Sequence, residues 1–324
     1  MTHAIRIHRP DGPEAMVWEA VEVGPPGPGE VRLRQTAIGI NYIDVYYRTG
    51  LYKLDLPSVM GRSGLGVIEE VGQGVDALRP GDRVVYAASP TGSYAEWRNM
   101  PAKVLVRVPA AIDDETAAAM FLQGMTAHYL LRRTHVVAPG ETILVHAAAG
   151  GVGLIMCQWA KHIGATVIGT VGSDEKAEIA RAHGCDHPIV YSRENFTDRV
   201  REITDGKGVP VVYDSVGKDT FMGSLDCVQP RGLMVSYGNA SGPVPPMDLA
   251  LLAEKGSLFI TRPTVVGYTS TREELLESTN DLIDAVTSGI VKIQINQTYA
   301  LKDAAQAHAD LEGRKTTGCS VLLP

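Results

Sequence analysis

Cysteine is scarce in this sequence, and its four residues lie far apart. The 324 residues contain no Cys-x-x-Cys spacing. Zinc clusters and dithiol redox centres depend on such spacings, so both are excluded as the basis of function. We expect four buried, reduced thiols, at Cys157, Cys185, Cys227 and Cys319.

Long apolar runs and an excess of basic charge are also missing. No segment approaches the ~20 apolar residues that a membrane-spanning helix requires, and no charged-then-apolar leader opens the chain. Lys and Arg number 30 against 37 Asp and Glu, for a net charge of −7. Nucleic-acid binding relies on clustered basic residues, so it is disfavoured, whereas a small anionic cofactor is not. We expect a soluble, cytoplasmic protein without a membrane span.

The first part of the chain is β-rich. Pro and Gly punctuate short strands, which is typical of a barrel. Carboxylates at 113–115 then open a helical stretch at 116–122, and a second helix is predicted at 126–133. The predicted strands are 4–8, 16–23, 30–40, 66–71, 82–86, 92–98 and 105–108.

After Pro139-Gly140 strands and helices alternate, which predicts a doubly wound parallel sheet of about six strands. Its predicted strands are 142–146, 166–171, 188–191, 209–214, 232–237 and 258–261, with helices at 151–163, 174–183, 196–204 and 220–228. A tail with helices at 271–288 and 303–312 and strands at 291–293 and 320–323 is expected to complete the first domain. The predicted domains are 1–124, completed by 267–324, and 125–266.

An apolar run at 143–147 leads into a glycine-rich turn and a helix. Backbone N–H groups of such a turn, with the positive end of the helix, bind a dinucleotide pyrophosphate. Ala148 occupies the first position of the usual G-x-G-x-x-G pattern, so the match is degenerate. His146 is expected to pack beneath the turn. The predicted pyrophosphate contacts are Ala149, Gly150, Gly151 and Val152.

The second strand of the sheet ends in Gly172-Ser173 without the carboxylate that binds the ribose 2′-hydroxyl of NAD. Lys176 follows and can meet a 2′-phosphate, which favours NADPH. In the alternative, Ser173 caps the helix and Lys176 is a solvated charge, while Asp174 and Glu175 argue against a phosphate. Tyr191 either flanks the adenosine or lies in a surface turn.

Further cofactor contacts are predicted at the carboxyl ends of later strands, where open α/β sheets bind ligands. Thr126, near the expected domain junction, either reaches the cofactor or caps a helix. Arg262 either lies near the substrate or forms a structural ion pair. The strand-end residues are Ser215, Gly217, Tyr237, Gly238 and Asn239.

The chain resembles the medium-chain dehydrogenase/reductase superfamily, and within it the NADPH:quinone oxidoreductase branch related to zeta-crystallin. The resemblance covers essentially the whole chain. It implies a GroES-like partial β-barrel domain and a Rossmann domain, α/β overall, with substrate bound in the cleft between them. The motifs that carry it are 39–44, 48–52, 81–86, 146–153 and 213–217.

The sequence departs from the zinc alcohol dehydrogenases of the same superfamily. Asn41 stands where their cysteine ligand is expected, and Gly61-Arg62-Ser63 replaces their Gly-His-Glu. Residues 87–101 contain no cysteine for a structural zinc loop. Because zinc requires about three or four protein ligands, we expect no metal. Alcohol oxidation then loses its Lewis acid, and readily reduced substrates are favoured.

Four polar residues are assigned to the active cleft, partly by the resemblance. Asn41 and Asp44 are expected to hydrogen-bond the nicotinamide ribose. Tyr46 and Tyr52 are expected to stack on a quinone and donate to its developing oxyanion, although both also suit a half-buried aromatic cluster. The predicted catalytic set is Tyr46, Tyr52, Asn41 and Arg262.

The expected function is NADPH-dependent, metal-free reduction of quinones by hydride transfer. One alternative is an enone or alkenal double-bond reductase, in which hydride goes to an activated carbon and a tyrosine or water protonates the neighbouring carbon. Another is an NADPH-binding structural or RNA-binding protein of the zeta-crystallin type. The strand 257–261, with 264–266 just beyond it, is expected at a sheet edge, which predicts a homodimer, although a covered edge in a monomer also fits.

Overall fold

The computed structural model describes residues 2–87 and 90–324. The chain forms two compact units. Unit 1 comprises Met1–Met125, Thr269–Asn280 and Ile293–Pro324, and unit 2 comprises Thr126–Tyr268 and Asp281–Lys292. The tail is therefore divided between the units, whereas the sequence assigned all of it to the first domain.

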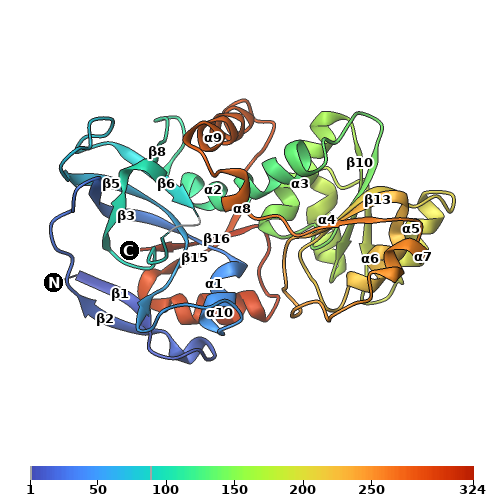
Figure 1. Ribbon diagram of the computed structural model, residues 1–324, viewed down its shortest axis with the longest axis horizontal. Helices are drawn as coiled ribbons and strands as arrows, with labels where there is room; N and C mark the ends of the chain where they lie inside the picture. The colour runs from blue at the N-terminus through green and yellow to red at the C-terminus, as the bar shows by residue number, and fades with distance from the viewer. Residues whose placement is uncertain (1, 88–89) are drawn as a thin grey trace. The chain divides into compact units, whose positions relative to one another are not determined.

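Unit 1 contains a seven-stranded sheet and a three-stranded sheet. The larger has the order β15-β16-β3-β5-β6-β8, with β7 also paired to β3, and the smaller has the order β2-β1-β4. β1 and β2 lie antiparallel near the N-terminus (Figure 1). The C-terminal strand pairs with β3, Ser320 opposite Ile40, so the end of the tail completes this sheet. The strands are β1(Thr2–Ile7), β2(Val17–Val21), β3(Glu30–Ile40), β4(Ser58–Val59), β5(Ser63–Val71), β6(Arg83–Ala87), β7(Trp97–Pro101), β8(Val106–Arg107), β15(Ile295–Ala300) and β16(Cys319–Leu323).

Two strand predictions in unit 1 and its tail are wrong. The strand predicted at 92–98 is β7, which begins only at Trp97 because Gly92 has a φ of +114° and the chain bends through 91–94. The strand predicted at 291–293 is absent from the described chain. There the Gln158 side chain accepts from the Lys292 N–H at 2.9 Å and donates to its carbonyl at 3.1 Å, so that backbone has no need of a strand partner.

The helices of unit 1 include one that the sequence reading missed. It is α1(Tyr42–Arg48), which begins immediately after β3. The predicted helix at 303–312 is confirmed as a short 3₁₀ turn followed by α10(Ala304–Glu312). The 3₁₀ turns are η1(Pro13–Ala15), η2(Ala102–Val104) and η4(Leu301–Asp303).

Two helices run through the divisions between the units. α2(Asp114–Tyr129) replaces the two predicted helices and continues into the π-helix η3(Leu130–Thr134), whose first carbonyl accepts the Tyr213 hydroxyl at 3.0 Å. The expected break at Gly124 does not occur, since glycine weakens a helix interior without ending it. α9(Arg272–Thr287) confirms the helix predicted at 271–288.

Unit 2 confirms the predicted doubly wound sheet. Its six strands are all parallel, in the order β11-β10-β9-β12-β13-β14, and lie among helices α3 to α7 (Figure 1). Its core is aliphatic, with Leu144, Ile168, Val212 and Met234 fully buried. The strands are β9(Thr142–Val145), β10(Thr166–Val171), β11(His187–Val190), β12(Val209–Asp214), β13(Val228–Ser236) and β14(Phe259–Thr261); the helices are α3(Gly151–Ile163), α4(Asp174–Ala182), α5(Phe196–Ile203), α6(Phe221–Cys227), α7(Ala250–Glu254) and α8(Val265–Tyr268).

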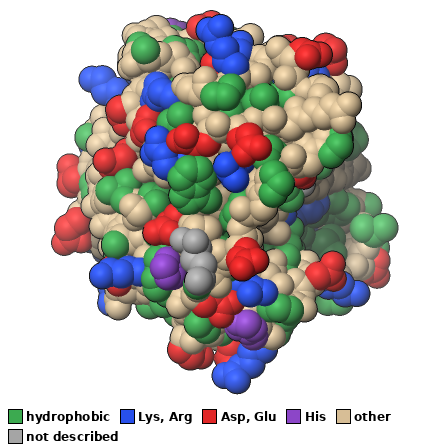
Figure 2. Space-filling view, turned by 90° about the vertical axis from the view of Figure 1, so that its left-hand side faces the viewer, with side chains coloured by type: hydrophobic (Ala, Val, Ile, Leu, Met, Phe, Trp, Pro, Cys, Tyr) green, Lys and Arg blue, Asp and Glu red, His purple; other side chains and the backbone are tan. Residues whose placement is uncertain are grey.

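The surface carries charges of both signs. Figure 2 shows Lys and Arg side chains interspersed with Asp and Glu on one face of the molecule. No helix among the described residues is both long and apolar enough to cross a bilayer. The four cysteines are free and buried, as expected.

Candidate functional site

The glycine turn before α3 is as tight as a pyrophosphate site requires. A Cβ on Gly153 would lie 2.3 Å from the Ala147 carbonyl oxygen, so only glycine fits there. Ala147 itself has a φ of +54°, and the Gly150 N–H donates to its carbonyl at 2.9 Å. Gly150 caps α3 from an extended conformation. The N-terminus of this 13-residue helix therefore begins at the turn, where its dipole and N–H groups suit an anion.

His146 lies buried beneath this turn. Its Nδ1 is 2.8 Å from Thr170 Oγ1, and its Nε2 is 2.9 Å from Ser224 Oγ. Ser224 in turn donates to Asp214 at 2.8 Å. Burial lowers the pKa of His146, which keeps the imidazole neutral. Both ring nitrogens form hydrogen bonds inside the unit. This agrees with the expectation that His146 packs beneath the turn.

The end of β10 brings Gly172, Ser173 and Tyr191 together. The Tyr191 N–H donates to Val171 at 3.1 Å, and a Cβ on Gly172 would lie 2.9 Å from the Tyr191 hydroxyl. Ser173 caps α4 by accepting the Lys176 N–H at 3.3 Å. Tyr191 is 41% exposed, which leaves its ring accessible to a ligand.

The ends of β12 and β13 form a second closely packed edge. Asp214 Oδ1 accepts the N–H groups of Val216 at 2.8 Å and Gly217 at 3.0 Å, and Gly217 has a φ of +90°. A Cβ on Gly238 would lie 2.3 Å from the Ser215 carbonyl oxygen. The two loops therefore approach as backbone against backbone, which holds their polar groups in fixed positions.

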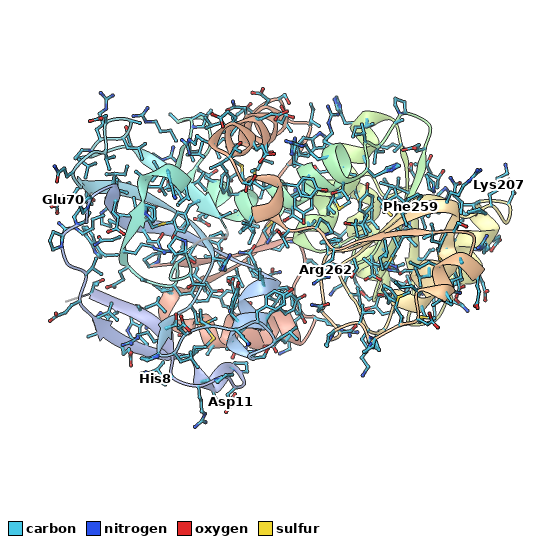
Figure 3. All side chains as sticks on the ribbon, viewed as in Figure 1. His8, Asp11, Glu70, Lys207, Phe259 and Arg262 are labelled. Carbon is cyan, nitrogen blue, oxygen red and sulfur yellow. The ribbon has the colours of Figure 1, made fainter. Side chains whose placement is uncertain are left out.

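Arg262 follows β14 and fastens the loop after β13. Its Nη1 donates to Gly238 O at 2.9 Å and to Ser236 Oγ at 3.2 Å. With the Asn239 amide oriented to satisfy both of its polar atoms, Asn239 accepts from Arg262 Nη2 at 3.0 Å. Figure 3 labels Phe259, the first residue of β14, and Arg262, which follows the strand. The groups that bond Arg262 in this loop are neutral, and they place Arg262 to support the segment that carries Tyr237.

Thr126 lies inside α2, so the helix-cap alternative for it is wrong. Its hydroxyl hydrogen-bonds Tyr129, whose pKa burial raises. The Tyr129 ring stacks on Tyr268 of α8, with centroids 4.8 Å apart and planes at 8°. Sequence reading overlooked both tyrosines and placed 264–266 at the sheet edge, where α8 instead takes up 265–268. Residues 147–153, 172–176, 215–217 and 237–239 of unit 2 include the predicted dinucleotide contacts, and we call them the dinucleotide site.

In unit 1, the structure brings the predicted tyrosines together. The Tyr46 and Tyr52 rings lie 5.3 Å apart, edge to face. Tyr42 joins Tyr46 at 5.7 Å, and Tyr47 joins Tyr52 at 5.6 Å. Tyr46 is 6% exposed and Tyr52 is half-buried. We call these four residues the tyrosine cluster. Its geometry suits both the stacking role and a half-buried aromatic core.

Asp44 is not placed to bind a ribose, and that prediction is corrected. Its carboxylate is 0% exposed and accepts the Asn41 N–H at 2.9 Å, which fixes the start of α1. The Tyr94 hydroxyl donates to the same Oδ2 at 3.1 Å, and His308 Nε2 lies 3.0 Å from that hydroxyl. Burial raises the pKa of Asp44 to about 7 and lowers that of His308 to about 3. Asp44 therefore positions Asn41 and α1.

The residues at the positions compared above with zinc ligands have hydrogen-bond partners within unit 1. Asn41 Nδ2 donates to Ser63 Oγ at 2.8 Å and to Gly39 O at 3.2 Å. Arg62 Nη1 donates to the Tyr47 hydroxyl at 3.0 Å, with its guanidinium 5.0 Å from that ring. Within residues 2–87 and 90–324, no three His, Cys, Asp or Glu side chains are grouped to hold a metal ion.

Comparisons with known proteins give this architecture a family. Residues 27–110 match the alcohol dehydrogenase GroES-like domain, and residues 151–286 match the zinc-binding dehydrogenase family. The chain is 52% identical to the quinone oxidoreductase of Pseudomonas aeruginosa over 325 residues, with 100% of both chains covered. It is 50% identical to a 2-haloacrylate reductase of a Burkholderia species, covering 100% of this chain and 99% of that one.

Solved structures agree with these relatives. The crystal structure of Escherichia coli quinone oxidoreductase complexed with NADPH is 49% identical and superposes with a TM-score of 0.98, over 99% of this chain and 100% of that one. The resemblance drawn from the motifs is thereby confirmed. The chain belongs to the quinone oxidoreductase family of the medium-chain dehydrogenase/reductase superfamily.

Proposed function

We propose that this protein is an NADPH-dependent quinone reductase that transfers hydride without a metal. The observation that carries the proposal is full-length identity of 52% to a quinone oxidoreductase, together with a glycine turn shaped for a pyrophosphate. A Cβ at Gly153 would fill that turn, so the residues present fit a dinucleotide. NADPH, when bound, supplies the hydride, and the reduced quinone also takes up a proton.

In this proposal the residues of the chain bind and orient the cofactor and the quinone. The α3 N-terminus receives the pyrophosphate, and Tyr191, Ser173 and Lys176 surround the 2′-phosphate. Ser215, Gly217 and the segment 237–239 hold the nicotinamide half, with Thr126 alongside. In unit 1, Tyr46 and Tyr52 stack on the quinone and donate to its oxygen, while Asn41 binds the cofactor ribose.

The metal-free part of the proposal rests on donor chemistry. Asn41 and Ser63 offer a neutral amide and hydroxyl that already bond each other at 2.8 Å, and Arg62 is cationic. Such a set is a poor match for Zn²⁺, which prefers thiolate, imidazole and carboxylate. The test is metal analysis with chelator: full activity of zinc-depleted protein is expected, and loss of activity restored by zinc would reject this part.

The direct test of function is NADPH oxidation with 1,4-benzoquinone, 9,10-phenanthrenequinone and 2-alkenals under one set of conditions. Quinone turnover is expected to dominate. Tyr46→Phe and Tyr52→Phe should lower kcat with quinone, and Val136→Ala, at an exposed position, serves as the matched control. Turnover of alkenals without any quinone turnover would reject the proposal.

A second candidate, reduction of activated alkenes, is favoured by one observation: the 50% identity to a 2-haloacrylate reductase. The hydride would go to an activated carbon, and a hydroxyl or water would protonate its neighbour. Including 2-chloroacrylate in the substrate panel separates the two functions.

We also propose a homodimer formed through β14. This strand is at the sheet edge and pairs only with β13 among the described strands, while Phe259 is 62% and Ile260 38% exposed. Exposed apolar edges favour pairing with a second copy. Sedimentation should give twice the 34.7 kDa chain mass, and Phe259→Asp should give monomer where Val136→Asp does not. A wild-type species of 34.7 kDa would contradict the dimer.

A further inference from the structure

An ion pair joins the turn after β11 to the first residue of α4. Arg193 Nη1 lies 2.6 Å from Asp174 Oδ2. The turn is held in place by its backbone, since the Arg193 N–H donates to Val190 at 3.1 Å and the preceding Tyr191 N–H donates to Val171 of β10. Arg193 therefore stands beside the end of β10, although it is 19 residues from Asp174 in the sequence.

The charges at this strand end are finely balanced. Asp174, Glu175 and Lys176 follow one another in the first turn of α4. Alone they sum to one negative charge, which would repel the charge of about −1.5 to −2 that a phosphate monoester carries. Arg193 brings the sum to zero. Its proximity also lowers the pKa of Asp174, so the carboxylate is ionised and the compensation is needed at neutral pH.

We propose that Arg193 is a selectivity residue that favours a dinucleotide with a 2′-phosphate over one with a free 2′-hydroxyl. The inference rests on the NADPH-dependent function proposed above. The end of the second strand of such a sheet is where the adenosine ribose is read. Arg193 supplies a positive charge there in addition to Lys176, and thereby offsets the carboxylate that would otherwise favour a free ribose hydroxyl.

The arginine side chain is free to serve a ligand while it keeps its carboxylate. A guanidinium has five N–H donors in a rigid fork, suited to phosphate oxygens. Arg193 and Asp174 are 58% and 66% exposed, and exposed pairs contribute little to stability. The other nearby carboxylate, Glu194, is 4.0 Å from Arg193 Nε and is already bonded to the Val190 N–H and Arg199.

The experiment compares kcat/KM for NADPH and NADH in Arg193→Gln, Asp174→Asn and the double variant. Arg193→Gln should lower the NADPH to NADH ratio about tenfold through KM for NADPH, with NADH changed less than about twofold. Asp174→Asn should raise the ratio. The double variant should return near the wild-type ratio because the two charge changes cancel. Arg193→Lys, which keeps the charge, should retain most of the selectivity.

Binding without turnover gives an independent readout. Calorimetric titration with adenosine 2′,5′-bisphosphate should weaken in Arg193→Gln, whereas titration with 5′-AMP should not, and added salt should shrink the difference. Arg181→Gln is the control, because Arg181 also pairs with an exposed carboxylate, Glu178, on α4. An equal loss for both ligands, or no loss for either, overturns the inference. Quinone reduction by the variants with NADPH would then still stand, so the two proposals fail separately.

Discussion

The Tyr94 hydroxyl donates to Asp44 Oδ2 across 3.1 Å, inside unit 1 where neither side chain reaches solvent. The Tyr94 hydroxyl has only one proton to donate, and His308 Nε2 lies 3.0 Å from the hydroxyl oxygen of Tyr94. With Asp44 ionised, Tyr94 donates to it and His308 donates to Tyr94. With Asp44 protonated, both bonds can reverse. The charge of Asp44 thus decides which group donates in each of these two hydrogen bonds. The same carboxylate also accepts the Asn41 N–H.

The first prediction concerns Asp44 and the pH dependence of stability. Burial raises the pKa of Asp44 from 3.8 to about 7, so the folded state binds the proton more tightly than the unfolded state. The resulting stabilisation is fully present below pH 4 and is lost as pH rises through 7, by a free energy on the order of 4 kcal/mol. Asp44→Asn should remove this dependence.

The measurement is urea denaturation of wild type and Asp44→Asn from pH 4 to 8. The stability of the variant relative to wild type should increase across this range and approach a plateau near pH 8. Asp76→Asn, at an exposed position, is the control and should follow wild type at every pH. A difference between Asp44→Asn and wild type that does not vary with pH would show that Asp44 keeps an ordinary pKa.

Tyr94→Phe tests the same hydrogen bonds, because Tyr94 lies between Asp44 and His308. The variant leaves a buried carboxylate with one donor fewer, which should cost roughly 1–3 kcal/mol in free energy of unfolding. Because the Tyr94 hydrogen bond lowers the pKa of Asp44, its removal should carry the loss of stability to higher pH. Tyr299→Phe is the matched control, since its hydroxyl donates to Asp310 in a less buried setting. Equal costs for the two variants would contradict a special role for Tyr94.

Local patterns in the sequence were sufficient for the parallel sheet and for the glycine turn. Alternating apolar strands and helices predict a doubly wound sheet because each buried strand must be covered by helices on both faces. The position of Gly153, in a turn between a predicted strand and a predicted helix, indicates the tight turn of a dinucleotide site. The structure has no room there for a Cβ. These features depend on neighbours within a few residues.

Features that join distant segments could not be predicted in the same way. Tyr94 and His308 are 214 residues apart, and neither has a local signal. Arg193 looks like a surface charge until the turn after β11 is placed beside Asp174. For Asp44 there was a usable signal, because Asn41 followed three residues later by an acid indicates a capped helix start. The mistaken strand at 291–293 has the opposite cause: a single distant side chain, Gln158, satisfies the backbone there.

Gly153→Ala should disable the dinucleotide site. The added Cβ would meet the Ala147 carbonyl at 2.3 Å and Ala148 at 2.8 Å, and backbone cannot yield as a flexible side chain does. We expect a cost of about 2 kcal/mol in stability and at least about tenfold weaker NADPH binding. Fluorescence titration with NADPH and thermal denaturation measure the two effects. Gly24→Ala, where a Cβ would meet nothing within 4 Å, should leave both unchanged.

Arg262→Gln should loosen the loop after β13 while leaving the sheet intact. The variant loses the fork that reaches Ser236 Oγ and Gly238 O, so the segment carrying Tyr237 is no longer held from that side. The function proposed above assigns Tyr237 to the nicotinamide, so its misplacement should raise KM for NADPH about fivefold and lower kcat. Steady-state kinetics with quinone measure both, and Lys207→Ala, at an exposed position far along the chain from this loop, is the control (Figure 3). If Arg262 instead contacts the quinone directly, Arg262→Gln will raise KM for quinone and leave KM for NADPH unchanged, and the supporting role assigned to it would then be wrong.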